Sequence, residues 1–78
     1  MLIVDDEQVI RDMLMTYLSL EGFSCKAVED GTVAVEELQR RPYHVVLSDM
    51  KMKVMGGLEL LSKMNELGLS ALCIIMTG

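Results

Sequence analysis

Four short apolar runs alternate with three segments of helical periodicity along this chain, and this alternation constrains the fold more than any other feature. A strand, a helix and a second strand joined by short connections form a parallel pair with a right-handed crossover. The sequence therefore predicts an α/β fold with one doubly wound parallel sheet and the element order βαβαβαβ. The strand-like runs are residues 2–4, 23–28, 45–49 and 71–76, and the helical segments are residues 9–18, 33–38 and 58–67.

Boundary residues support these elements. Gly22 and Gly68 follow the first and third helical segments, where glycine commonly ends a helix. A turn at Asp30 leads into the second helical segment. Residues 23–28 alternate between apolar and polar side chains, which is typical of an edge strand, whereas residues 45–47 are continuously apolar. The latter run predicts a central strand that is buried on both faces.

The composition indicates one small globular domain with 51% hydrophobic residues in a chain of 78. The formal net charge of −5 argues against direct contact with nucleic acid or with an anionic membrane surface. No apolar run approaches the roughly 20 residues that cross a bilayer. Cys25 and Cys73 lack the spacing of metal ligands, so we expect reduced, buried thiols in a cytoplasmic protein.

Polar side chains stand where three of the strand-like runs end. Asp5 and Asp6 follow the first run, Asp49 ends the third, and Thr77 follows the fourth. Ligands of open parallel sheets bind beyond the carboxyl ends of the strands, so these residues are expected to converge in one crevice. Three close carboxylates repel one another unless a cation compensates them, and hard oxygen ligands favour Mg²⁺ over zinc. We therefore expect a magnesium site.

Three strings in order resemble the receiver domains of two-component response regulators. LIVDDE at 2–7 is similar to the first strand and acidic pair of that family, VVLSDMKM at 45–52 to its acceptor strand and loop, and IIMTG at 74–78 to its fourth strand. The resemblance covers residues 1–78 and implies the first βαβαβαβ part of one receiver domain. It implies a flavodoxin-like sheet with strand order 2-1-3-4.

The resemblance also implies a role for each residue of the site. Asp49 is the expected phosphoacceptor, and Asp6 and Asp49 are expected to bind Mg²⁺ directly. Asp5 is expected to act through water, and the backbone carbonyl of Lys51 to complete the protein ligands. Thr77 is the expected switch hydroxyl. The phosphoryl donor is expected to be a sensor histidine kinase or a phosphotransfer protein, and the domain is expected to catalyse its own phosphorylation and dephosphorylation.

Two departures from the family pattern carry further expectations. Lys53 occupies the position four residues after the acceptor at which the family usually has proline, so the loop loses a fixed φ angle. The chain also ends before the family's fifth strand, its last two helices, its lysine and its aromatic switch residue. Residues 72–76 of the fourth strand are apolar at every position, so either the chain is a fragment of a longer protein, or a partner covers this strand and the uncovered sheet face. If the 78 residues are all there is, we expect a homo-oligomer.

Several alternative interpretations remain open from the sequence. The chain could be a truncated receiver-like scaffold that serves assembly without phosphotransfer. An aspartate-nucleophile phosphohydrolase is a weaker alternative, since that class has a second aspartate where Lys51 stands. Taken alone, Asp5 with Gln8 is typical of a helix-capping pair. His44 is expected to be structural, because it lies at the opposite end of its strand from Asp49.

Overall fold

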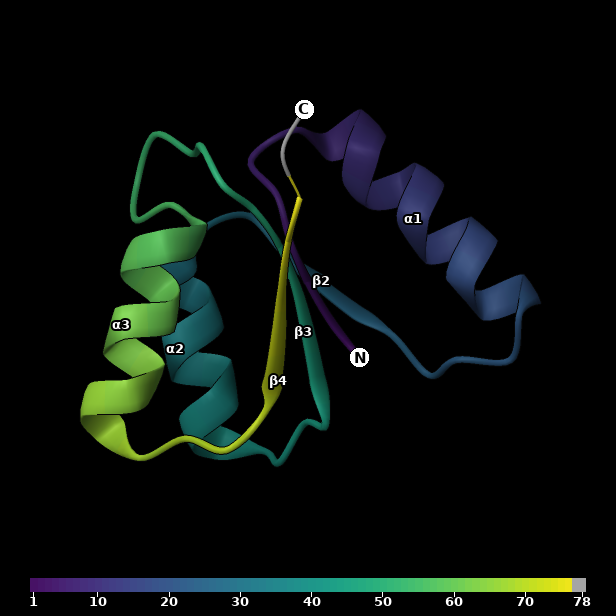
Figure 1. Ribbon diagram of the computed structural model, residues 1–78. Coiled ribbons are helices and arrows are strands. Elements are labelled where there is room, and N and C mark those ends of the chain that lie inside the picture. Colours follow the sequence, from purple (N-terminus) through teal and green to yellow (C-terminus); the bar gives the residue numbers. More distant parts are fainter. Residues whose placement is uncertain (77–78) are drawn as a thin grey trace.

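The computed structural model describes residues 1–76, which form one four-stranded parallel sheet and three helices (Figure 1). The strand order is β2-β1-β3-β4, so the expected α/β class and the expected order 2-1-3-4 are confirmed. The elements are β1 (Leu2–Val4), α1 (Gln8–Leu20), β2 (Lys26–Val28), α2 (Gly31–Arg40), β3 (Val45–Asp49), α3 (Gly57–Leu67) and β4 (Leu72–Met76).

The helices lie on both faces of the sheet. Figure 1 shows α2 and α3 side by side on one face and α1 on the other. The core lies under α2 and α3, where alternate strand residues point into one apolar layer. Its buried side chains are Leu2, Val4, Val28, Ala34, Val35, Leu38, Val46, Leu60 and Met64.

Glycine and aspartate define the helix ends largely as expected. The Asp30 carboxylate accepts hydrogen bonds from the backbone N–H groups of Thr32 and Val33 and so caps α2. Gly68 ends α3 with a φ of 69°, a left-handed conformation that suits glycine. The Asp5–Gln8 capping pair, an alternative interpretation of Asp5 taken alone, does not form. Glu7 is the N-cap of α1 and makes no side-chain capping bond.

Three other expectations need correction. β2 begins only at Lys26, so the strand is shorter than residues 23–28, although it does lie at the sheet edge. β3 is not buried on both faces, because Val46 and Ser48 are buried while the alternate residues are half-buried. Cys25 and Cys73 are free thiols, yet both are half-buried rather than buried. The exposure of the alternate β3 residues follows from the α1 face of the sheet, which is only partly covered, whereas Cys73 packs at the margin of the core on the other face.

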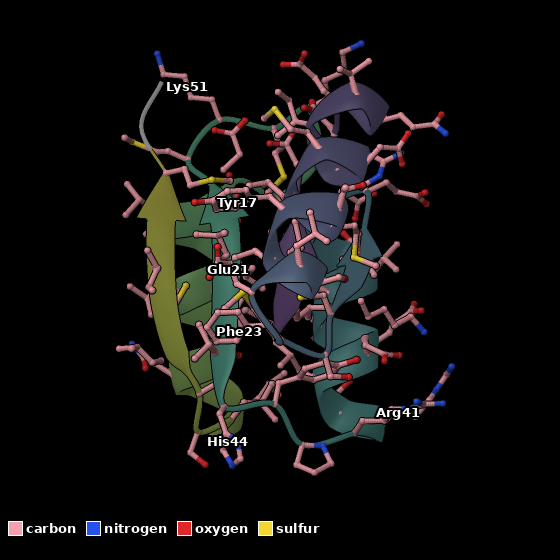
Figure 2. All side chains as sticks on the ribbon, turned by 90° about the vertical axis from the view of Figure 1, so that its right-hand side faces the viewer. Tyr17, Glu21, Phe23, Arg41, His44 and Lys51 are labelled. Atoms are coloured by element: carbon pink, nitrogen blue, oxygen red, sulfur yellow. The ribbon has the colours of Figure 1, made fainter. Side chains whose placement is uncertain are left out.

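Apolar side chains remain exposed on and around that face. α1 contacts β1 and β2, while β4 contacts α3 on the opposite face. Leu72 and Ile74 of β4 pair with Val45 and Leu47 of β3, and they keep 63% and 46% of their surface exposed. Figure 2 looks onto this side of the molecule, with Tyr17 and Phe23 beside the sheet. The α1 face of β3 and β4 is therefore an exposed apolar surface.

None of the helices within residues 1–76 is both long enough and apolar enough to cross a membrane.

A buried carboxylate ties three segments together at the end of the sheet away from the acidic residues. Glu37 of α2 is only 4% exposed, and it accepts a hydrogen bond of 2.5 Å from the Tyr43 hydroxyl. Lys26 of β2 and Arg41 complete the group, with nitrogen–oxygen distances of 3.4 Å and 3.9 Å. The Tyr43 hydrogen bond is the main cause that lowers the pKa of Glu37, against the effect of burial. Burial and Glu37 together raise the pKa of Tyr43 to about 12.

These pKa shifts predict how stability depends on pH. The folded pKa of Tyr43 lies above its ordinary value of 10.0, so its stabilising effect is complete below that pH and disappears as the pH rises through about 12. The lowered pKa of Glu37 works in the opposite direction, so its effect is present above pH 4.5 and disappears in stronger acid. We expect Tyr43→Phe to lower the melting temperature at neutral pH and to flatten its alkaline decline, as measured by circular dichroism.

Tyr17 provides the matched control, because it is the second tyrosine and is 62% exposed. Tyr17→Phe should retain the pH profile of the wild type. An identical alkaline decline in Tyr43→Phe and wild type would contradict the assignment.

Candidate functional site

The register of the central strands brings the acidic residues together. Val4 pairs with Ser48 in the parallel β1–β3 ladder, so Asp5 and Asp49 are the next residues at the carboxyl ends of two neighbouring strands. Asp5 also continues the pairing with β2, because its N–H donates to the carbonyl of Val28 at 3.2 Å. Asp6 follows in the turn that leads to α1. The backbone thus places three carboxylates at one edge of the sheet.

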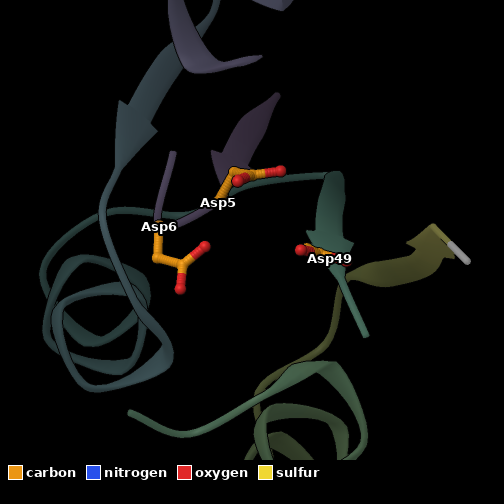
Figure 3. A group of neighbouring side chains, drawn as sticks. All are labelled: Asp5, Asp6 and Asp49. Atoms are coloured by element: carbon orange, nitrogen blue, oxygen red, sulfur yellow. The ribbon is translucent and has the colours of Figure 1, made fainter. Parts of the chain in front are cut away.

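The three carboxyl groups face one small region. One oxygen from each of Asp5, Asp6 and Asp49 can be chosen so that all three atoms lie within 4.8 Å of one another. Figure 3 shows the side chains directed toward a common space beyond the ends of β1 and β3. Asp5 is buried, Asp49 is half-buried and Asp6 is more exposed than Asp5, so the cluster opens outward on the side of Asp6.

Backbone N–H groups hold each carboxylate in place. The Glu7 N–H donates to Asp5 Oδ1 at 2.9 Å, and the Lys53 N–H donates to Asp6 Oδ2 at 3.3 Å. The Lys51 N–H makes a longer contact of 3.5 Å with Asp49 Oδ1. These bonds orient the carboxylates without neutralising them. Each carboxylate keeps a second oxygen available to another ligand.

Arg11 supports the acidic turn in a different way. Its guanidinium Nη1 donates to the backbone carbonyl of Asp5 at 2.7 Å. The contact fixes the chain between β1 and α1, while the charge of Arg11 is directed at a carbonyl rather than at a carboxylate. The sequence interpretation missed this residue. The sequence feature that could have indicated Arg11 is a basic side chain six positions after Asp5, in the first turn of the helix that follows the acidic pair.

The donor set fits a hard divalent cation. Three carboxylates at this separation repel one another in a partly buried environment, and a cation between them reverses the sign of that interaction. The cluster contains oxygen donors and no His or Cys, which suits Mg²⁺ or Ca²⁺ better than zinc or copper. Three carboxylates leave several coordination positions for water or a substrate oxygen, as Mg²⁺ sites usually do.

The other residues singled out from the sequence lie as follows. Lys51 is two residues beyond Asp49, and the role of its carbonyl as a ligand stays a prediction. Thr77 lies outside the described residues. Figure 2 shows His44 and Lys51 at opposite ends of the sheet, and the structural role of His44 stays a prediction. Hollows lined by Pro42 and Tyr43 also lie at the His44 end and include none of the three aspartates.

Comparison with known sequences gives one consistent answer. Residues 1–78 match the family described as the response regulator receiver domain. The chain is 35% identical over 77 residues to the sensor histidine kinase RcsC of Escherichia coli K12, covering 99% of this chain and 8% of that protein. It is 32% identical over 65 residues to the response regulator RR06 of Streptococcus pneumoniae serotype 2 strain D39, covering 83% of this chain and 30% of that protein. The chain therefore spans less than a third of the length of either relative.

Solved structures share the fold. The crystal structure of FixJ-N superposes with a TM-score of 0.93 at 30% identity, covering 99% of this chain and 62% of that one. The response regulator TrrA of Thermotoga maritima, solved in complex with Mg²⁺–BeF, gives 0.90 at 32% identity, covering 97% of this chain and 66% of that one. The chain spans about two thirds of the length of each of these structures.

The match of residues 1–78 to this family and the superposition on the two solved structures agree with the observed parallel sheet of order 2-1-3-4. The chain belongs to the response regulator receiver domain family.

Proposed function

We propose that this chain is the phosphoacceptor part of a two-component signalling protein and that Asp49 receives the phosphoryl group. The proposed donor is a phosphohistidine on a sensor kinase or a phosphotransfer protein. The observation that carries the proposal is the meeting of Asp5, Asp6 and Asp49 around one space at the carboxyl edge of the sheet. The match of residues 1–78 to the receiver family supports it.

The proposed reaction transfers a phosphoryl group from a histidine nitrogen of the donor to a carboxylate oxygen of Asp49. A carboxylate oxygen of Asp49 attacks the phosphorus, the P–N bond breaks, and the electron pair of that bond leaves with the imidazole, which takes up a proton. The product is an acyl phosphate on Asp49, which water later hydrolyses back to the carboxylate and inorganic phosphate. Asp49 suits this role because it is half-buried and has an oxygen free of backbone contacts.

A divalent cation belongs to the same proposal. Asp6 and Asp49 would hold Mg²⁺ directly, Asp5 through water, and the Lys51 carbonyl would complete the protein ligands. When bound, the ion supplies positive charge that compensates the carboxylates and the incoming phosphoryl oxygens. The TrrA complex with Mg²⁺–BeF supports a magnesium site in a relative at 32% identity. Thr77 is proposed as the switch hydroxyl on the sequence pattern alone.

Phosphorylation of Asp49 can be tested with acetyl phosphate as the small donor. We expect intact-mass spectrometry to show a single phosphoryl adduct on the wild type that depends on Mg²⁺ and is removed by hydroxylamine, which cleaves acyl phosphates. Asp49→Asn should abolish the adduct, because an amide oxygen is a poor nucleophile.

Asp12→Asn is the matched control, since Asp12 is an exposed residue of α1. This variant should be phosphorylated as the wild type is. Mg²⁺ binding without any adduct on the wild type would support the scaffold alternative instead. An adduct that persists in Asp49→Asn would place the acceptor elsewhere.

We also propose that the 78 residues, taken on their own, form a homo-oligomer through β4. This strand is an edge of the described sheet, and the exposed Leu72 and Ile74 extend the apolar surface around α1. An unprotected apolar edge favours pairing with a second strand. Analytical ultracentrifugation should therefore give a dimer or larger species at micromolar concentration.

A charge placed on that surface should weaken the assembly. Leu72→Lys changes a side chain that is already 63% exposed, so the monomer fold should tolerate it while self-association decreases. Glu59→Lys, an exposed change in the first turn of α3, is the control for added charge. A folded wild-type monomer at micromolar concentration would end the proposal.

A further inference from the structure

The backbone amide of Lys53 contacts the acidic cluster, although Lys53 is distant from Asp6 in the sequence. Its N–H donates to Asp6 Oδ2 at 3.3 Å, and the two residues are 47 positions apart. Lys53 belongs to the loop between β3 and α3, so this bond connects the acceptor loop to the turn after β1. It is also the position at which the sequence departs from the proline expected of the family.

The acceptor loop, residues 50–56, is held in place by its own contacts. The Gly57 N–H donates to the Met50 carbonyl at 3.1 Å and closes the base of the loop. Met55 has a φ of 50° and packs against Gly31, the first residue of α2. A Cβ at position 31 would lie 2.5 Å from the Met55 carbonyl oxygen, so the absence of a side chain there permits the contact. The loop therefore presents the Lys53 N–H from a defined position.

Asp6 gains most from such an anchor. Asp6 is more exposed than Asp5. An exposed carboxylate rotates freely, and it loses that conformational entropy when a bound ligand orders it. The Lys53 N–H occupies Oδ2 and leaves Oδ1 for a cation. Donors that orient a metal ligand in this way commonly change metal affinity by about 10-fold to 100-fold when they are lost.

We propose that the Lys53 backbone amide is a positioning group for Asp6, one that a proline at the same position could not supply. The inference rests on the proposed function, because it assumes that Asp6 binds Mg²⁺. The amide acts through the carboxylate and does not itself touch the ion. The presence of an N–H at position 53 therefore tightens cation binding, whichever side chain the residue carries.

The experiment measures Mg²⁺ affinity in variants that keep or remove the N–H. Lys53→Ala retains the amide and removes only the exposed side chain, so its dissociation constant should stay close to that of the wild type. Lys53→Pro removes the donor and should weaken Mg²⁺ binding by about tenfold or more. Titration with MgCl₂ alone, followed by NMR of the ¹⁵N-labelled chain, gives the dissociation constants, and melting temperatures without Mg²⁺ report any loss of fold.

Proline also fixes φ, so a second variant isolates the hydrogen bond. A chain of 78 residues can be assembled chemically with an ester in place of the amide between Met52 and Lys53. The ester removes the N–H while it retains the side chain and adds no ring. It should weaken Mg²⁺ binding in the same direction as Lys53→Pro.

A metal-free measurement completes the test. The Lys53 amide proton should shift upfield and exchange faster in Asp6→Ala, because its acceptor is gone. Wild-type affinity in the ester chain, or an amide proton that ignores Asp6→Ala, would overturn the positioning role and leave the proposed function standing. A wild type that binds no Mg²⁺ would overturn both.

Discussion

The parallel pairing of β1 with β3 is the constraint on which the rest of the site depends. Val4 lies opposite Ser48, so the chain direction itself delivers Asp5 and Asp49 to adjacent positions. A slip of one residue would move every side chain of β1 to the other face, and Leu2, Val4 and Val46, all fully buried, oppose it. The apolar core under α2 and α3 thereby fixes the separation of carboxylates that take no part in it.

Much of this arrangement was predictable because it depends on local patterns. Apolar runs that end in aspartate, separated by segments of helical spacing, are enough to predict a parallel sheet with its acidic residues at one edge. The strand order was predicted from the resemblance of three short sequence segments, residues 2–7, 45–52 and 74–78, to the family. Helix ends at Asp30 and Gly68 followed from the chemistry of single residues, so they too could be read from the sequence.

The errors concern interactions that the sequence does not encode locally. Glu7 is the N-cap of α1, so Asp5 lies two residues before the capping position, and its carboxylate accepts from the Glu7 N–H instead. The half-burial of alternate β3 residues depends on α1 lying over β1 and β2, and strand composition does not reveal where a helix packs. The bond from Lys53 to Asp6 depends on the path of a loop, and no periodicity describes that path.

The backbone contacts of the three carboxylates also explain how the site can be both acidic and ready to accept a cation. Each carboxylate accepts from an N–H, which is a dipole that neither titrates nor carries a full charge. A lysine or arginine in the same place would form an ion pair that a divalent ion must first displace. Within the described residues, Arg11 approaches the cluster but donates to a backbone carbonyl oxygen. None of the ion pairs observed among residues 1–76 includes Asp5, Asp6 or Asp49. The negative charge of the three carboxylates is therefore not compensated by a basic side chain that a divalent ion would have to displace.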